Sequence, residues 1–256
     1  ISTLSLHAAL PISAADVECL AGAGPQSLDD WRLHYLRVRA LKRSLMVGRP
    51  EMRFGELLVC KRRMPSYAHL VAQYYGWRQR AGGGLFAVTQ PGHSLALRDL
   101  TGGRLPPGSF LEPRVHPDGR RVLSAFVACD LTTPEPSSLP VNEAGPDERY
   151  FHLYEIAADG SGLRQLTRGP YDDMMADYLP DGGLVFCSTR RKGYSRCFGP
   201  QYSPRWDTYT LHRADGDGGN IRTLSWNDVS EWFPAVGHAG EILFARWDYI
   251  DRDAVT

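Results

Sequence analysis

The hydrophobic and polar positions divide this chain into one helical stretch followed by a long series of short strands. Over residues 29–47 the apolar positions recur at helical spacing and share one face, which carries Trp31, Tyr35, Val38 and Leu45. Ser27 or Asp29 can cap the start of this helix, and Gly48 followed by Pro50 ends it. The opposite face is basic and is either a docking face for a partner or anionic surface, or a solvated face.

Beyond Pro50 the pattern changes to short apolar runs of strand length. Clusters of Gly, Pro, Asp and Asn separate these runs, as expected for strands joined by turns. The predicted strands are residues 57–60, 85–89, 122–127, 153–156, 184–187, 209–212 and 242–245.

A tight-turn motif recurs ahead of three of these strands. Its glycine accepts a positive φ without a Cβ clash, which is typical of hairpin turns. The copies are HPDG at 116–119, LPDG at 179–182 and GHAG at 237–240. Six residues before each turn glycine stand Pro113, Ala176 and Pro234. The turn glycines are 63 and then 58 residues apart, so the period is uneven.

A second family of turns lies upstream of the first. Its copies are QPG at 90–92, ADG at 158–160 and ADG at 214–216. Each copy follows a predicted strand and precedes a Leu-Thr or Leu-Ser pair: Leu100-Thr101, Leu166-Thr167 and Leu224-Ser225. The repeating unit is therefore a strand, a DG turn, a strand ending in Leu-Thr/Ser, a loop, a PDG turn and another strand.

Four short antiparallel strands per repeat are typical of a β-propeller blade, whose usual length is about 40–50 residues. The units here are longer and therefore carry loop insertions. A blade cannot bury both faces alone, and about 4–8 blades usually close a ring. The sequence predicts an all-β fold: a partial β-propeller of four-stranded antiparallel blades, with about three clear units and one N-terminal helix. A compact β-sandwich is the alternative.

The repeated pattern LYxxxxDGxxxxxLT … PDGxxxFxS resembles the TolB-like propeller repeats over residues 85–245. Four longer stretches resemble proteins related to the hydrazine synthase alpha subunit. They are FGELLVCKRRMPSYAHLVAQYYGWRQRAGGGLF, DLTGGRLPPGSFLEP, YLPDGGLVFCSTRRKGYSRC and NDVSEWFPAVGHAGEILFARWDYIDRD. This second resemblance runs from about residue 39 to residue 256. It implies a propeller and a periplasmic or extracellular location.

Hydrazine synthase joins nitric oxide and ammonia with c-type haems, which need Cys-x-x-Cys-His for attachment. The chain contains no such motif. The resemblance therefore implies that c-type haem is held by segments outside this chain or is absent, and no cofactor is predicted within it.

Three functions follow from these observations. The first is a scaffold or interaction module that supports assembly or docks a redox domain. The second is a part of a haem-dependent oxidoreductase. The third is a carbohydrate- or peptide-binding propeller, in which Trp77 and Trp232 would contact the ligand. No catalytic constellation decides whether the chain is enzymatic.

Composition narrows the partners. The chain has 256 residues, with 29 basic and 29 acidic side chains, so its formal net charge is zero. A balanced chain lacks the overall field that attracts nucleic acid. No apolar run approaches the roughly 20 residues that span a bilayer. We therefore expect a protein partner or redox domain, with no nucleic acid and no membrane span.

Three domains are predicted. Residues 1–13 resemble a translated sequencing adapter and are interpreted as an artefactual leader, or else as a genuine disordered one. Residues 14–50 form a helical N-terminal segment, and residues 51–256 form the propeller domain, which we expect to be truncated.

Five cysteines cannot all pair within one chain. Cys187 and Cys197 are close enough in sequence for a disulfide, and the alternative is that both are buried thiols.

Two groups of side chains are candidates for binding. Aromatic residues and a histidine crowd residues 66–78 and give the pocket candidates Tyr67, His69, Tyr75 and Trp77. His69 is either a ligand or proton carrier, or a satisfied core histidine. A basic strand exit gives the candidates for anion or partner binding, Arg190, Arg191, Lys192 and Arg196, whose alternative is a solvated loop.

Carboxylates gather in two loops, which hold Asp172, Asp173 and Asp177, and Asp248, Asp251 and Asp253. They could bind calcium, although neither loop has the EF-hand spacing. The alternative is that Asp177 and Asp248 brace strand ends by accepting backbone hydrogen bonds. No metal motif, Walker loop, dinucleotide fingerprint or nucleophile elbow is present, so no metal site is predicted.

Overall fold

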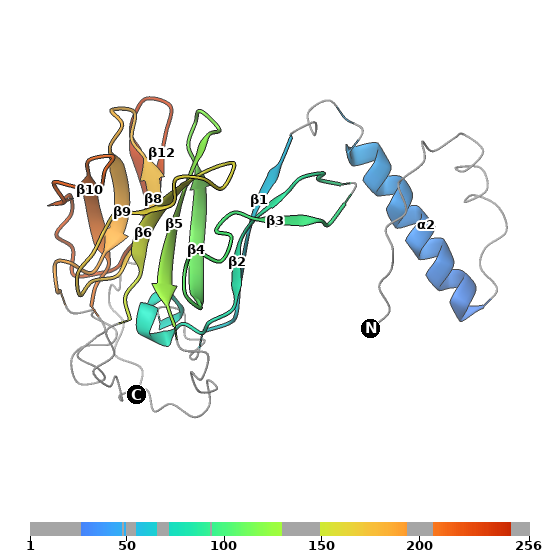
Figure 1. The fold of residues 1–256 in the computed structure, drawn as a ribbon, viewed down its shortest axis with the longest axis horizontal. Helices are drawn as coiled ribbons and strands as arrows, with labels where there is room; N and C mark the ends of the chain where they lie inside the picture. Colours follow the sequence, from blue (N-terminus) through green and yellow to red (C-terminus); the bar gives the residue numbers. More distant parts are fainter. Residues whose placement is uncertain are drawn as a thin grey trace. The chain divides into compact units, whose positions relative to one another are not determined.

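The computed structural model describes residues 27–47, 49, 55–65, 72–92, 94–129, 149–193 and 207–246. The chain falls into two units. Unit 1 comprises Ile1–Leu58 and Ala87–Arg98, and unit 2 comprises Val59–Phe86 and Asp99–Thr256. The described residues are mostly β, in four sheets, with one α-helix (Figure 1).

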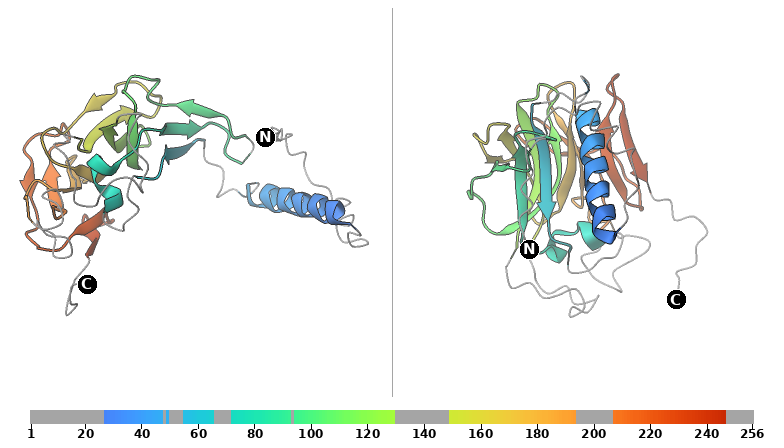
Figure 2. Two further views of the ribbon diagram at one scale, coloured as in Figure 1. Left: turned by 90° about the horizontal axis from the view of Figure 1, so that it is seen from below. Right: turned by 90° about the vertical axis from the view of Figure 1, so that its right-hand side faces the viewer.

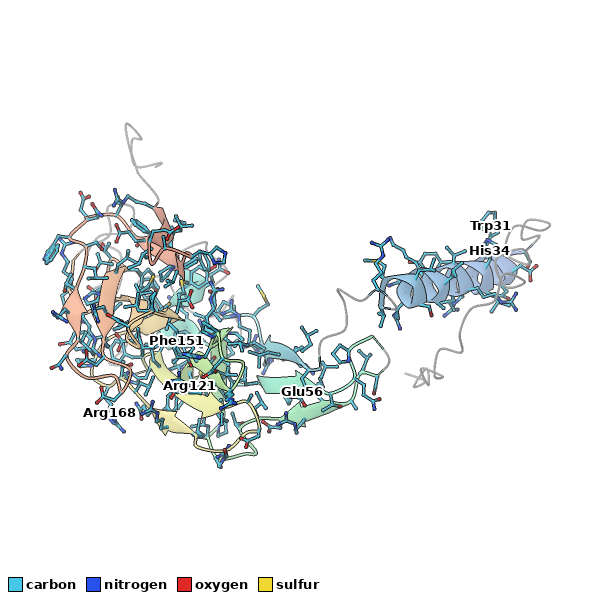
Figure 3. All side chains as sticks on the ribbon, turned by 90° about the horizontal axis from the view of Figure 1, so that it is seen from above. Trp31, His34, Glu56, Arg121, Phe151 and Arg168 are labelled. Carbon is cyan, nitrogen blue, oxygen red and sulfur yellow. The ribbon has the colours of Figure 1, made fainter. Side chains whose placement is uncertain are left out.

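The predicted helix is confirmed as α2, Leu28–Val47. Ser27 caps its start, because Ser27 Oγ accepts a hydrogen bond from Asp30 N at 3.1 Å and donates one to Asp30 Oδ2 at 2.7 Å. Trp31 and His34 project from its N-terminal half (Figure 3). None of the helix residues is buried, so its apolar face is uncovered within the described chain. No helix in the described part is long and apolar enough to cross a membrane.

The strands form short antiparallel meanders. Two sheets have four strands, β4-β5-β6-β7 and β11-β10-β9-β8, one has the order β1-β2-β3, and β12 pairs with β13. All seven predicted strands are present. The bounds are β1 Leu57–Arg62, β2 Gly83–Val88, β3 Leu97–Asp99, β4 Gly108–Val115, β5 Arg121–Ala128, β6 His152–Ala157, β7 Arg164–Gln165, β8 Asp173–Tyr178, β9 Leu184–Ser188, β10 Thr210–Ala214, β11 Arg222–Thr223, β12 Glu231–Val236 and β13 Ile242–Arg246. Short 3₁₀ helices span Ala72–Tyr74 and Gly76–Arg78.

The predicted repeating unit and the observed sheets begin at different strands. Each four-stranded sheet begins with the PDG hairpin and ends with the DG hairpin, whereas the predicted unit began with the DG hairpin. The predicted unit therefore joins strands of two neighbouring sheets. A tandem repeat has no intrinsic starting point, and only hydrogen bonding between strands fixes where a sheet begins.

The third DG turn lies two residues later in the structure than predicted, because its turn glycine is Gly218 and not Gly216. The glycine with positive φ is Gly218 (φ 87°), which corresponds to Gly160 (φ 92°) in the preceding copy. Gly218 N donates to Asp215 O at 2.9 Å, and Asp217 Oδ1 accepts from Gly219 N at 2.8 Å. Two successive Asp-Gly pairs made the register ambiguous in the sequence.

The Leu-Thr/Ser pairs continue the strand ladder. Thr167 Oγ1 accepts a hydrogen bond from Leu153 N at 3.0 Å, and Ser225 Oγ accepts one from Leu211 N at 2.9 Å. Leu153 and Leu211 lie in the third strands of their sheets, β6 and β10, and the short fourth strands β7 and β11 end before they reach these amides. The hydroxyl groups accept the hydrogen bonds there, since a buried amide without an acceptor is costly.

The core lies in unit 2, between the sheets. All five residues of β9 are buried, as its continuous apolar run predicts. The first strands lie against one another in chain order, β4 beside β8 and β8 beside β12. Figures 1 and 2 show the three sheets that begin with these strands following one another through the unit.

Candidate functional site

The first strand of each of three sheets carries a β-bulge at the same repeat position. The register shifts occur between Leu111 and Arg114, between Met174 and Asp177, and between Trp232 and Ala235. Each bulge holds one non-glycine residue at positive φ: Glu112 at 47°, Met175 at 54° and Phe233 at 54°. Such a conformation costs about 1–3 kcal/mol and persists only where the surroundings impose it. The fold therefore imposes this strained conformation in all three copies.

A signal for these bulges was present in the sequence. Pro113, Ala176 and Pro234 each follow the strained residue directly. Proline within a strand is largely confined to edges and bulges, since it has no N–H for the ladder. The repeated prolines thus marked two of the three bulges.

A cavity of about 500 Å³ opens beside the first bulge. Its lining residues are Cys60, Arg62, Tyr74, Phe110, Leu111, Glu112, Pro113 and Arg114. They come from β1, from the 3₁₀ helix that ends at Tyr74, and from β4. The Tyr74 ring meets the ring of Phe233 edge-on, with centroids 5.9 Å apart. The first and third bulges therefore both border this part of unit 2.

The charged side chains of the cavity have no direct partners in the part of the chain that the structure describes. Among the ion pairs and side-chain hydrogen bonds of the described residues, none involves Glu112, Arg62 or Arg114. The Arg62 Nη1 atom is buried and has no hydrogen-bond acceptor among those residues. Two guanidinium groups and one carboxyl therefore face the cavity with unused hydrogen-bonding capacity.

Burial shifts the titration of the cavity's groups. It raises the pKa of Glu112, against the lowering effects of Arg114 and Arg62. Burial also raises the pKa of the Tyr74 phenol and of the Cys60 thiol, and the Glu112 charge adds to both shifts. Tyr74 and Cys60 are therefore neutral at pH 7 and available as hydrogen-bond donors.

The predicted aromatic pocket is placed differently. Tyr75 and Trp77 are buried in the core; the Tyr75 hydroxyl donates to Asp207 O at 2.7 Å, and its ring lies 5.0 Å from that of Tyr209. Tyr67 and His69 lie outside the described residues, so their roles stay predictions. From the described part of this aromatic stretch it is the neighbouring Tyr74, not one of the predicted residues, that lines the cavity.

The predicted basic group is engaged within the chain. Arg190 makes a bidentate pair with buried Asp173, with Nη2–Oδ2 at 2.6 Å and Nε–Oδ1 at 3.0 Å. Lys192 Nζ lies 3.1 Å from Asp207 Oδ2, and Arg191 donates to the carbonyl of Asn227. These side chains hold their loop in place, and anion or partner binding by them stays a prediction. Arg196 lies outside the described residues.

Of the three carboxylates of the first predicted loop, Asp173 and Asp177 lie in strand β8, and Asp172 and Asp177 brace the backbone. Asp172 Oδ1 accepts from Gly76 N at 3.0 Å and from Phe151 N at 2.9 Å; Figure 3 labels Phe151 among the strands. Asp177 Oδ2 accepts from Val236 N at 3.0 Å, which confirms the bracing role predicted for it. Within the described ranges, no three potential metal ligands gather at one point. The second loop, with Asp248, Asp251 and Asp253, is outside those ranges.

Cys187 is a free and fully buried thiol. Its Sγ donates to Glu231 O at 3.2 Å, and burial raises its pKa well above the usual value. This corresponds to the buried-thiol alternative for Cys187, whereas Cys197, its expected disulfide partner, is not among the described residues.

The fold is similar to that of several solved proteins. The hydrazine synthase of Kuenenia stuttgartiensis matches with a TM-score of 0.50 and 17% identity, over 74% of this chain and 27% of that one. A protein described as TolB from Agrobacterium tumefaciens matches with a TM-score of 0.44 and 17% identity, over 67% of this chain and 48% of that one. A puromycin-hydrolyzing peptidase of Mycobacterium tuberculosis has a TM-score of 0.39 and 14% identity, over 77% and 26%.

These likenesses concern the fold alone. The chain spans about half the length of the TolB chain and about a quarter of the hydrazine synthase chain. No protein-family model matches the chain, and a comparison with characterised proteins gives no match.

Proposed function

We propose that unit 2 is part of a TolB-like β-propeller whose successive sheets are blades. Two features support this architecture. The first strands β4, β8 and β12 neighbour one another in chain order, as the innermost strands of adjacent blades do. Each also carries the same bulge, as expected where equivalent strands meet around a common axis.

This propeller serves as an interaction module in a periplasmic or extracellular protein similar to the hydrazine synthase alpha subunit. Its task is to bind a segment of another protein or domain during assembly. The observation that supports this function is the cavity at the β4 bulge, where Glu112, Arg62 and Arg114 have no direct partners within the described ranges. Half-buried charges that lack a protein partner among the described residues, gathered in a concave space, are typical of sites that bind a ligand.

The cavity favours this function over the third candidate's carbohydrate form. The two residues expected to contact a sugar, Trp77 and Trp232, are both buried, so carbohydrate binding would depend on another aromatic residue, such as the exposed Trp226. A haem-dependent reaction would need haem-binding segments, and this sequence has no Cys-x-x-Cys-His motif.

A peptide library tests the interaction function. The whole chain is screened against random synthetic heptapeptides, and the dissociation constants of selected peptides are measured by fluorescence anisotropy. We expect selected peptides to bind the chain and to lose about tenfold or more in affinity with Arg114→Ala. The matched control is Arg213→Ala, which removes a partly exposed arginine paired with Asp181 far from the cavity in sequence, and which should bind as the wild type does. A library without a single binder, or binders that ignore Arg114→Ala, would contradict the proposal.

A further inference from the structure

We infer that the cavity at the β4 bulge recognises a peptide carboxylate, held by the guanidinium groups of Arg62 and Arg114. The inference rests on the proposed function, because it names the chemical group that the interaction module binds. The carboxylate belongs either to the C-terminus of the bound segment or to an Asp or Glu side chain within it.

The balance of charge in the cavity points to an anion. Two arginines and one glutamate are the charged residues among the described ones that line the space. Arginine presents a planar set of donors that matches the two oxygens of a carboxylate. Arg62 as a whole is half-buried and lines the cavity, and within the described chain it makes no ion pair or side-chain hydrogen bond. A ligand oxygen at its guanidinium would therefore form a hydrogen bond that these residues do not supply.

The rest of the lining suits a peptide more than a small inorganic anion. Phe110 and Leu111 are buried apolar wall residues, and Pro113 extends this wall. The Phe110 ring is fixed against Phe126, with centroids 4.8 Å apart. A volume of about 500 Å³ is in the range of pockets that hold small organic ligands. An apolar side chain next to the carboxylate would fill the space that the arginines leave.

Substitutions of Glu112 and Arg114 should change the affinity for a carboxylate in opposite directions. When ionised, its carboxylate repels a carboxylate bound at the two arginines. Glu112→Gln removes this repulsion while keeping the shape of the side chain, so it should tighten binding by about threefold. Arg114→Ala should weaken binding by about tenfold to a hundredfold. A variant that only damaged the fold would weaken binding in both cases.

The closing experiment uses peptides attached to an array through their N-termini. Each sequence is present with a free C-terminal carboxylate and as the carboxamide, and each acidic side chain is replaced by its amide in a further copy. The wild type, Arg114→Ala, Glu112→Gln and the control Arg213→Ala are each applied, and circular dichroism confirms that all four are folded.

The inference predicts that one amide replacement abolishes binding, and which one it is identifies the source of the carboxylate. Loss on C-terminal amidation assigns the chain end, and loss on side-chain replacement assigns Asp or Glu. Peptides that bind equally well in all three forms, or more weakly to Glu112→Gln, would overturn the carboxylate site and leave the interaction module intact. An array without any binder would instead contradict the proposed function.

Discussion

The bulges of β4 and β8 share one backbone conformation and differ in what they do with it. Glu112 and Met175 occupy equivalent positions with φ values of 47° and 54°. The Met175 side chain is only 2% exposed and belongs to the core, whereas Glu112 lines a cavity. The repeat therefore sets the backbone strain, and the residue placed on it decides which copy becomes a candidate site.

A second position sharpens this contrast. Two residues before each strained residue stand Phe110, Asp173 and Glu231, all buried. The carboxylates of Asp173 and Glu231 pair with Arg190 and Arg246, at 2.6 Å and 3.0 Å. In the first of these sheets, which begins with β4, the same position is apolar: it holds Phe110, whose ring packs at a tilt against that of its cross-strand neighbour Phe126. The first copy thus carries its charge at the cavity, whereas the other two neutralise theirs in the interior.

The largest expected effect separates these two kinds of arginine. Arg190→Ala leaves the fully buried Asp173 carboxylate without its partner, so it should lower the free energy of unfolding by about 3–5 kcal/mol. Arg114 has no ion-pair partner among the described residues, so Arg114→Ala should change the free energy of unfolding by no more than about 0.5 kcal/mol. Urea denaturation of both variants measures the difference. Equal losses would mean that Arg114 is as structural as Arg190.

Substituting glycine for the strained residue of a bulge shows how much of the free energy of unfolding comes from backbone strain and how much from side-chain packing. Met175→Gly relieves the strain but removes a buried side chain, so we expect a net loss of about 1–2 kcal/mol in the free energy of unfolding. Glu112→Gly loses little packing and should gain about 0.5–1 kcal/mol, because relief of strain exceeds the added chain entropy. Thermal unfolding followed by circular dichroism compares the two. A loss of stability in Glu112→Gly would show that its side chain supports the fold.

The smallest effect is a dependence of stability on pH. Because burial raises the pKa of Glu112 above 4.5, the folded state holds this proton more tightly than the unfolded state does. The stabilisation is fully present below pH 4.5 and is lost as the pH rises through the raised pKa. The wild type should therefore lose stability relative to Glu112→Gln on going from pH 4 to pH 7. Urea titrations of both proteins at several pH values measure this difference, and a constant difference would contradict a raised pKa.

Local chemistry was enough to predict seven of the strands, the turns of the PDG family and the helix cap. The run at 184–187 is apolar throughout and became a strand buried on both faces. Asp118 and Asp181 accept hydrogen bonds from the backbone two residues on, at 2.8 Å and 3.0 Å, as their turn motif requires. These features depend on neighbours within a few residues, so the sequence alone contains the information.

The cavity was not predicted, because its parts are distant in the chain. Cys60, Tyr74 and Glu112 meet only through the packing of separate elements. The aromatic cluster in the sequence predicted Tyr75 and Trp77 as pocket residues. In the structure Tyr74, at the end of a short 3₁₀ helix, lines the cavity, whereas Tyr75 and Trp77 are buried in the core. A one-residue difference in orientation cannot be read from composition.

The sequence by itself determined the helix, the most apolar strands, the PDG hairpins and the existence of a repeat, because hydrophobic spacing and turn residues act locally. The tertiary structure alone decided where each sheet begins, which bulge residue is buried and which charges are left without partners. Those properties depend on hydrogen bonds and burial between segments far apart in the chain, and a linear pattern does not specify them.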